Sequence, residues 1–425
     1  MEYMRSAYGI ERWGMDKLLC GKIRISIAIS VASAALLFAG LYSGYENSRD
    51  PVKIGVLHSL TGTMATSEAP LVDALRLAVE EANREGGIDG AQIEMIVADC
   101  RSDAEYCAQQ ADNLIASEGV NALFGCWTSA CRKAVRKVVE KHGHLLFYPL
   151  QYEGMEKSPN IIYTGAAPNQ QVIPMVSWAM QEHGKRAFLV GSNYEFPLVT
   201  NRIVKKLLYA KGGVAVGERY LPLGEKSMAA LVREIKEKRP DFVLNTINGD
   251  SNLYFFRALQ EAGISAEDIP VFSTSIAEVE LAVIGPELMA GHYAAWNYFQ
   301  SIDSSENRDF VERFRNRFGP QRVLDDPMEA SYIAFKLWVN ALRSKRGKDR
   351  LDINNVLAQQ SLVAPEGIVA VDIPTHHLWK PVRIGRARAD GNFDIVWQSE
   401  RSIAPAPYPF FIPADQMGEM AGGAP

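Results

Sequence analysis

Lys53–Leu57 reads KIGVL, a short apolar run of β-forming residues. The polar turn SLTGT follows at Ser59–Thr63, and an apolar stripe with helical spacing then occupies residues 71–82, until Gly86 and Gly87 end it. A buried strand, a turn and an amphipathic helix, in that order, form the first half of a βαβ unit. The stretch therefore predicts an α/β fold with a parallel sheet.

The same alternation of strand and helix continues in two successive runs. In the first run we expect further strands at Ile93–Ala98, Ala122–Phe124 and Leu145–Tyr148. In the second run, which starts near Gln170, we expect strands at Ala187–Val190, Val214–Tyr220 and Phe242–Asn245. Strands separated by helices of about 10–15 residues indicate parallel sheets. Two such runs predict two doubly wound lobes with a hinge and an interlobe cleft.

The C-terminal third has a different order of elements. Two expected helices precede three expected strands, at Ile368–Asp372, Leu378–Arg388 and Phe393–Gln398, and the last two strands form a hairpin. This order predicts that the chain returns to complete both lobes. The expected divisions are 1–50 for an N-terminal signal or anchor, 51–166 for lobe 1, 167–295 for lobe 2, 296–362 for a return to lobe 1, 363–412 for a return to lobe 2 and 413–425 for a flexible tail.

The N-terminus carries an uncharged apolar run at residues 25–42, and Lys17, Lys22 and Arg24 precede it. A positive flank followed by an apolar run is typical of an export signal, and the length of the run also suits an uncleaved membrane anchor. A buried core helix is the alternative. Export predicts that the rest of the chain lies outside the cytoplasm, in the periplasm or its equivalent, either free or tethered to the inner membrane by residues 25–42.

Composition excludes several classes of function. The chain has 425 residues, with 45 Lys and Arg against 50 Asp and Glu and a net charge of −5, so it lacks the basic surface that nucleic acid requires. Five Cys and seven His are too few for a disulfide-dense scaffold or an array of metal sites. We expect no cofactor, no metal and no nucleic-acid partner.

Four cysteines, Cys100, Cys107, Cys126 and Cys131, lie close together in the sequence. Outside the cytoplasm they can form disulfides, and three full pairings are open. A bond from Cys100 or Cys107 to Cys126 would join neighbouring elements of one sheet. Four free, buried thiols are the alternative.

In doubly wound sheets, ligands bind at the carboxyl ends of the strands. The segments that follow the expected strands contain mostly hydroxyl, amide and aromatic side chains, with few cationic residues and no glycine-rich dinucleotide motif: residues 59–63, 99, 125–129, 148–153, 191–194, 246–250 and 273–275. Such a set suits a small neutral polar ligand better than a phosphate or a zwitterionic amino acid.

Several of these segments match motifs of a known family: GCWTSACRKAV at 125–135, YPLQYEG at 148–154, SPNIIYTGAAPNQQ at 158–171, GSNYEFP at 191–197, NTINGDSN at 245–252, DDPMEASY at 325–332 and HLWKPVRIG at 377–385. With them the chain resembles periplasmic binding proteins of the branched-chain amino acid and amide group. Within that group it resembles the substrate-binding proteins of urea ABC transporters most, and short-chain amide receptors are the nearest relatives. The resemblance implies the type I periplasmic-binding-protein fold and a receptor that closes on its ligand and delivers it to a membrane permease and its ATPase.

The resemblance also implies the binding residues. Ser129 matches the serine that meets the amide, and Trp127 departs from the tyrosine that amide receptors usually have there. Leu150 departs from a threonine in the same way. The expected ligand-binding residues are Trp127, Thr128, Ser129, Tyr148, Gln151, Tyr152, Tyr194 and Ser273. For Ser129 a helix N-cap is the structural alternative, and for the tyrosines and Trp127 it is core packing.

Urea is small and polar throughout, so its receptor must satisfy every donor and acceptor. We expect the N–H and hydroxyl of Ser129 to point at the carbonyl from a helix N-terminus. A ligand of this size gains at most roughly −6 kcal/mol, so it requires enclosure between the lobes.

Two other functions are open from the sequence. One is an amide sensor with the same fold that acts through a partner protein, against which the export segment counts. The other is a hydrolase that uses Cys126 or Cys131 with His142 or His144. These histidines are expected at the far end of the following helix, away from the cleft. We therefore predict a binding protein without catalytic residues.

Overall fold

A computed structural model describes residues 49–344, 356–357 and 359–421. The predicted signal or anchor falls on residues 1–50 and so lies, apart from its last two residues, outside the described part. Within that part no helix combines the length and the apolar character needed to cross a bilayer. Residues from Pro51 onward form one compact unit, which is described below.

The first sheet has eight strands in the order β11-β12-β13-β5-β4-β3-β1-β2. Its parallel part consists of β1 (Val52–His58), β2 (Ile93–Asp99), β3 (Leu123–Gly125), β4 (Leu146–Tyr148) and β5 (Ile161–Tyr163). The helices that belong to this unit, lobe 1, are α2 (Ala65–Arg84), α3 (Ala104–Ala116), α4 (Ser129–His142), α11 (Ser305–Phe318) and α12 (Asp326–Ser344). Phe124 stacks on Phe147 in its core, and Trp338 of α12 meets Phe124 edge-on.

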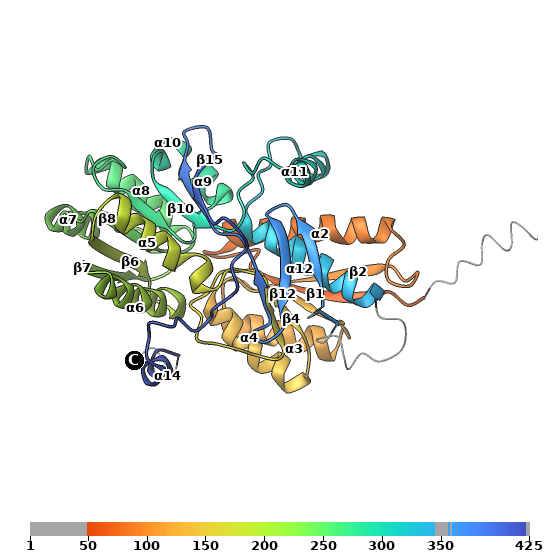
Figure 1. Cartoon of the computed structure of the whole chain (residues 1–425). Helices are drawn as coiled ribbons and strands as arrows, with labels where there is room; N and C mark the ends of the chain where they lie inside the picture. The colour runs from red at the N-terminus through yellow and green to blue at the C-terminus, as the bar shows by residue number, and fades with distance from the viewer. Residues whose placement is uncertain (1–48, 345–355, 358, 422–425) are drawn as a thin grey trace, which may run out of the picture. The chain divides into compact units, whose positions relative to one another are not determined.

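The second sheet has seven strands in the order β15-β14-β10-β9-β8-β6-β7. Its parallel strands are β6 (Arg186–Ser192), β7 (Val214–Leu221), β8 (Phe242–Thr246), β9 (Val271–Ser273) and β10 (Tyr293–Trp296). The helices of this unit, lobe 2, are α5 (Val172–Glu182), α6 (Glu195–Ala210), α7 (Ala229–Lys238), α8 (Ser251–Glu261), α9 (Glu278–Ile284) and α10 (Pro286–Met289), with the short 3₁₀ turn η1 (Pro168–Gln170) before α5. The two doubly wound lobes predicted from the sequence are confirmed (Figure 1).

The C-terminal strands contribute to both sheets, but not as predicted. β11 (Ser361–Ala364), β12 (Gly367–Asp372) and β13 (His377–Trp379) pair in the first sheet, whereas the sequence predicted a return to lobe 2 from residue 363. The single strand expected at Leu378–Arg388 is two strands, β13 in lobe 1 and β14 (Arg383–Ala387) in lobe 2. Pro381 lies between them, and a proline cannot donate a ladder hydrogen bond, so it ends the strand where the chain crosses.

The hairpin of β14 with β15 (Phe393–Gln398) is confirmed. Beyond it, α14 (Ala414–Ala421) lies in the segment that was expected to be a flexible tail.

Three chain segments that pass between the lobes meet at Asn297. Its buried side-chain amide donates to the carbonyl of Gln170 at 3.1 Å and to that of Pro381 at 2.7 Å. The backbone N–H of Asn297 donates to Asp326 at 2.9 Å. Asn297 therefore connects the segments that pass between the lobes. It lies on the side of the cleft where the chain links the two lobes covalently.

Both disulfides are local. They join Cys100 to Cys107 and Cys126 to Cys131, so neither suggested bond to Cys126 from the first pair is formed, and the cysteines are not free thiols. Each bond closes one strand-to-helix turn, where the Cα atoms are 4.5 Å and 5.6 Å apart, within the range that a disulfide spans. The two bonds pack together, with Cys107 Sγ 3.3 Å from Cys131 Sγ.

Candidate functional site

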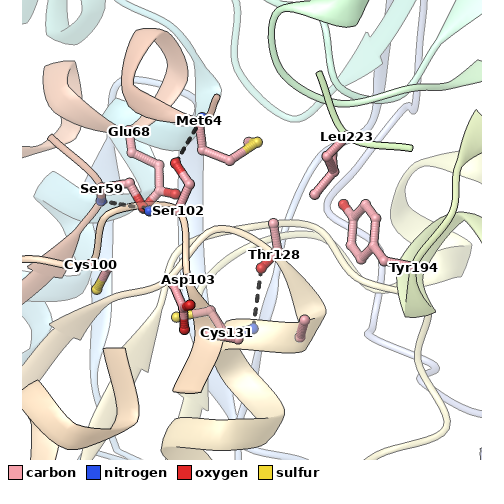
Figure 2. Close-up of a pocket in the computed structure, with 12 residues that line it drawn as sticks. Ser59, Met64, Glu68, Cys100, Ser102, Asp103, Thr128, Cys131, Tyr194 and Leu223 are labelled. Carbon is pink, nitrogen blue, oxygen red and sulfur yellow. Dashed lines mark hydrogen bonds between the residues drawn. The ribbon is translucent and has the colours of Figure 1, made fainter. Parts of the chain in front are cut away.

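A small cavity lies between the lobes at the carboxyl ends of the lobe 1 strands (Figure 2). Its volume is about 80 Å³. Lobe 1 supplies most of the wall, from the turns after β1, β2 and β3, and lobe 2 closes it with Tyr194 and Leu223. The lobe 1 residues are Ser59, Met64, Glu68, Cys100, Ser102, Asp103, Ala104, Thr128, Ala130 and Cys131.

Glu68 gives this cavity a carboxylate. It lies in the first turn of α2, is only 4% exposed, and accepts a hydrogen bond from the backbone N–H of Ser59 at 2.9 Å. Its Oε2 also lies 3.3 Å from Nδ1 of the buried His58. Glu68 was not among the residues expected from the sequence. The signal was present, since Glu68 stands three residues before Leu71 on the apolar stripe of the helix, where a charged side chain must be buried.

Hydrogen-bond donors face the cavity from two other elements. Thr128 caps α4, and because its Oγ1 accepts from the N–H of Cys131 at 3.1 Å, its hydroxyl proton stays available. The first N–H groups of α4 have no partner within the helix and carry its positive end. Burial, together with the nearby Tyr148 and Glu153, raises the pKa of Tyr194, so its phenol keeps the proton that it can donate.

Ser129 belongs to a buried charged network behind this cavity. Its hydroxyl donates to Glu153 at 2.5 Å and accepts from the guanidinium of Arg132 at 2.9 Å. Arg132 donates further to Glu153 and to Glu156, each at 2.8 Å. Burial alone would lower the pKa of Arg132, but the charges of the two glutamates raise it above its usual value. Arg132 was not among the expected residues, although it lies in the motif that carried the resemblance.

Two expected tyrosines surround the same guanidinium. Arg132 lies 5.1 Å from the ring centre of Tyr148 and 4.6 Å from that of Tyr152. The Tyr148 hydroxyl donates to the carbonyl of Trp127 at 2.6 Å, and the Tyr152 hydroxyl lies 2.7 Å from Nε2 of His377. His377 is fully buried, and burial lowers its pKa to about 4.

Two other expected residues connect the lobes. The indole N–H of Trp127 donates to the side-chain oxygen of Asn248 at 3.1 Å. The amide of Gln151 donates to the carbonyl of Thr274 at 2.9 Å and to Ser275 Oγ at 3.2 Å. These bonds run from lobe 1 to lobe 2, so the structure shows the two lobes in contact across the cleft.

The eight expected residues therefore fall into four places. Thr128 and Tyr194 line the cavity, Ser129, Tyr148 and Tyr152 surround Arg132, and Trp127 and Gln151 bridge the lobes. Ser273 is buried at the end of β9, where it accepts from the side chain of Asn245 at 3.1 Å. Thr128, and not Ser129, is the N-cap of α4.

The chemistry for a cysteine hydrolase is not assembled around the cavity. Cys126 and Cys131 are bonded to each other, so neither offers the thiolate that a nucleophile needs. His142 bonds to Asp112 at 2.8 Å on the far end of α4, and His144 faces the carbonyl of Val120. The arrangement suits recognition by hydrogen bonds.

Comparison with known proteins gives one family match over most of the chain. Residues 52–414 match the model of the periplasmic binding protein domain. The Leu/Ile/Val-binding protein homolog 6 of Brucella melitensis biotype 1 is 23% identical over 350 residues, which cover 80% of this chain and 89% of that protein.

A limonene hydroxylase of Geobacillus stearothermophilus is 39% identical over 124 residues, but this match covers 29% of the chain and 23% of that enzyme, so the chain spans less than a quarter of its length. Among solved structures, the solute-binding protein of an ABC transporter from R. palustris in complex with 4-hydroxybenzoate superposes with a TM-score of 0.76. Its sequence is 22% identical, and the match covers 83% of this chain and 98% of that chain. At this identity the likeness concerns the fold.

Proposed function

Because the chain belongs to the periplasmic binding protein family, whose members serve outside the cytoplasm as solute-binding receptors of ABC transporters, we propose that it binds a small neutral amide. Urea is the first choice, and acetamide or formamide is the alternative. The receptor would release this ligand to the permease and ATPase of its transporter. The observation that carries the choice of ligand is the small interlobe cavity, with donors on one wall and a carboxylate on another.

The size of the cavity favours a ligand of very few atoms. A water-sized group needs about 10–15 Å³ of cavity volume, so a cavity of about 80 Å³ accommodates roughly five to eight such groups. Urea and acetamide fit that space. Leucine and 4-hydroxybenzoate, with roughly twice as many non-hydrogen atoms, do not fit it without the lobes moving apart.

The polarity of the walls favours an amide over an acid. An amide carbonyl can accept from Thr128, Tyr194 and the first turn of α4. Its NH2 group can donate to Glu68. A carboxylate ligand would instead bring a second negative charge next to Glu68, at a cost that a buried site does not offset without a cation.

The lobes approach closely enough to enclose such a ligand. A Cβ atom on Gly249 would lie 2.7 Å from the carbonyl oxygen of Thr63, and one on Gly224 would lie 2.9 Å from the Thr63 side chain. Glycine at these two positions lets loops of lobe 2 reach the turn that precedes α2 of lobe 1. Close approach matters because a four-atom ligand gains at most about −6 kcal/mol, and every polar group left in water or unpaired reduces that gain.

Isothermal titration calorimetry of the full chain with urea, acetamide, formamide, leucine and 4-hydroxybenzoate tests the proposal. We expect binding of urea in the range of tens of micromolar and no heat from leucine or 4-hydroxybenzoate. The variant Glu68→Gln should weaken urea binding at least tenfold, and the exposed control Glu105→Gln on α3 should not. Tight binding of leucine or of 4-hydroxybenzoate, without binding of urea or acetamide, would refute the ligand assignment.

A further inference from the structure

His58 contacts Glu68, the carboxylate in the wall of the ligand cavity. It is the last residue of β1, which lies between β2 and β3 in the first sheet, and its side chain is fully buried. Its ring Nδ1 lies 3.3 Å from Glu68 Oε2, and the backbone N–H of Ser59 donates to the same oxygen at 2.9 Å. The end of one strand therefore presents two neighbouring groups to one carboxylate oxygen.

The surroundings of the His58 ring select the nitrogen that carries its proton. Nε2 is buried and has no hydrogen-bond partner among the described residues. A proton on Nε2, in the other tautomer or in the charged ring, would therefore be a donor left unpaired in the interior. On Nδ1 the proton points to Glu68 Oε2, since an ionised carboxylate can only accept. A neutral ring with this proton binds the carboxylate without cancelling its charge.

The two oxygens of Glu68 consequently have different roles. Oε2 accepts both bonds from the end of β1, whereas Oε1 makes no hydrogen bond to any of the described residues. Because Glu68 lines the cavity, Oε1 is the oxygen that is left for a ligand. The terminal torsion of a glutamate has broad minima, so a carboxylate held by one donor can turn, and a second donor on the same oxygen restricts that rotation.

We infer that His58 is a positioning residue of the ligand site: through its bond to Oε2 it keeps Glu68 Oε1 available as the acceptor for an N–H group of the ligand. The inference rests on the proposed function, in which Glu68 accepts from the NH2 group of a small amide. A carboxylate that turns freely has to be ordered when the ligand binds, and that cost lowers the affinity for a ligand of few atoms.

A double-mutant cycle on the full chain tests whether His58 acts through Glu68. Calorimetry measures the affinity for urea and for acetamide in His58→Leu, Glu68→Gln and the double variant. Leucine is apolar and offers no donor, so His58→Leu should weaken binding by about fivefold or more. The double variant should be no more than about twofold weaker than Glu68→Gln alone. Fully additive losses would show that His58 does not act through Glu68 and would overturn the inference.

The variant His58→Asn separates positioning from packing. The amide nitrogen of asparagine is the same number of bonds from the backbone as Nδ1 of histidine, so it can donate to Glu68 Oε2 in its place. The affinity of His58→Asn should stay within about threefold of the original protein, although the smaller side chain lowers stability. An affinity as low as that of His58→Leu would mean that the packing of the ring matters and its donor does not, and the inference would fail.

His292→Leu is the matched control. His292 is also buried, but it lies in lobe 2 directly before β10, where its Nδ1 accepts from the backbone N–H of Val271 at 3.0 Å. It does not line the cavity, so His292→Leu should lose stability and keep its affinity for urea within about twofold. An equal loss of affinity in both leucine variants would be a general effect of a disturbed core, contrary to the inference.

Crystal structures of the ligand-free His58→Leu and His292→Leu proteins decide the positioning role without any ligand. We expect the Glu68 carboxylate to turn or to lose its single orientation in the first protein, and to keep its bond to the N–H of Ser59 in the second. An unmoved and equally ordered Glu68 in His58→Leu overturns the inference. If the original protein binds neither urea nor acetamide, the proposed function fails, and these structures still decide the role of His58.

A second variant covers the case in which His58→Leu does not fold. His58→Gln then takes its place in every measurement, with the same expected results. The amide nitrogen of glutamine lies one bond further from the backbone than Nδ1, so it does not replace the donor to Glu68 Oε2.

Discussion

Two groups of buried charges lie in this protein, and they are balanced differently. In the first group, the buried Arg132 and Arg136, which is 37% exposed, face Glu153 and Glu156. The charge of Arg132 outweighs burial and lowers the pKa of Glu156 to about 2. Where the chain passes between the lobes, buried acids outnumber the buried cations Lys380 and Arg383. These acids are Glu278, Glu280, Asp325, Asp326, Glu329 and Glu366.

The excess of acids has a direct effect on their protonation. Burial raises the pKa of Glu278 to about 8, and it raises that of Glu366 to about 7 despite an ion pair with Lys380 at 3.3 Å. Glu280 of lobe 2 and Asp325 of lobe 1 both have a raised pKa, and each has a buried carboxyl oxygen without a hydrogen-bond partner among the described residues. The nearby arginines thus lower the pKa of the buried Glu156 behind the interlobe cavity, whereas burial raises the pKa of the acids at the junction of the lobes. The number of nearby cations decides which of the two occurs.

The largest effect should follow from removing the cation of the balanced group. Arg132→Met leaves Glu153 and Glu156 buried without the partner that neutralises them, and the free energy of unfolding should fall by about 3–5 kcal/mol. Guanidinium chloride denaturation followed by circular dichroism measures this loss. Urea is unsuitable as denaturant, because it is the proposed ligand. A loss below 1 kcal/mol would mean that the two glutamates relax into water, and the contrast between the two groups would disappear.

The next effect concerns the acid-rich group and depends on pH. The folded-state pKa of Glu278 lies above its ordinary value of 4.5, so the folded protein binds more protons than the unfolded one between pH 4.5 and about 8. Stability from this group is complete below pH 4.5 and is lost as the pH rises towards 8. Glu278→Gln, which resembles the protonated acid, should remove about 2–4 kcal/mol of this decline.

Thermal unfolding of both proteins from pH 5 to pH 8.5 measures that difference. Part of the decline should remain in Glu278→Gln, because Glu366 titrates in the same range. The surface variant Glu105→Gln serves as control and should follow the original protein at every pH. Parallel curves for Glu278→Gln and the original protein would show that the pKa of Glu278 is not raised in the folded state. The contrast between the two groups of charges would then fail.

The strands show how far the sequence predicts the fold of this protein. The strand at Lys53–Leu57 was expected within one residue of the observed β1, because a short apolar run between turn residues depends on local chemistry. The single strand expected at Leu378–Arg388 is not observed, because its two halves, on either side of Pro381, pair in different sheets. Pairing of that kind depends on residues far apart in the sequence.

The same limit applies to the site. Thr128 and Tyr194 could be predicted as cavity residues because each lies within three residues of a strand end. Glu68 and Arg132 were missed because a charged residue on a helix is usually exposed, and only tertiary packing buries these two. The disulfide pairing also could not be chosen, since a sulfur of one bond lies against a sulfur of the other in the fold, with Cys107 Sγ 3.3 Å from Cys131 Sγ.

The smallest effect should come from the residue next to Arg132. Lys133 of α4 forms an ion pair with Glu195 of α6 in lobe 2, and the two side chains are 32% and 16% exposed. Water competes for both charges, so Lys133→Met should change the free energy of unfolding by less than about 1 kcal/mol, as measured in guanidinium chloride against the exposed control Lys137→Met. Because this pair joins the lobes, its loss should weaken urea binding by no more than about fivefold. A loss of stability as large as that of Arg132→Met would contradict the comparison, because position on α4, and not burial of the charge, would then set the size of the effect.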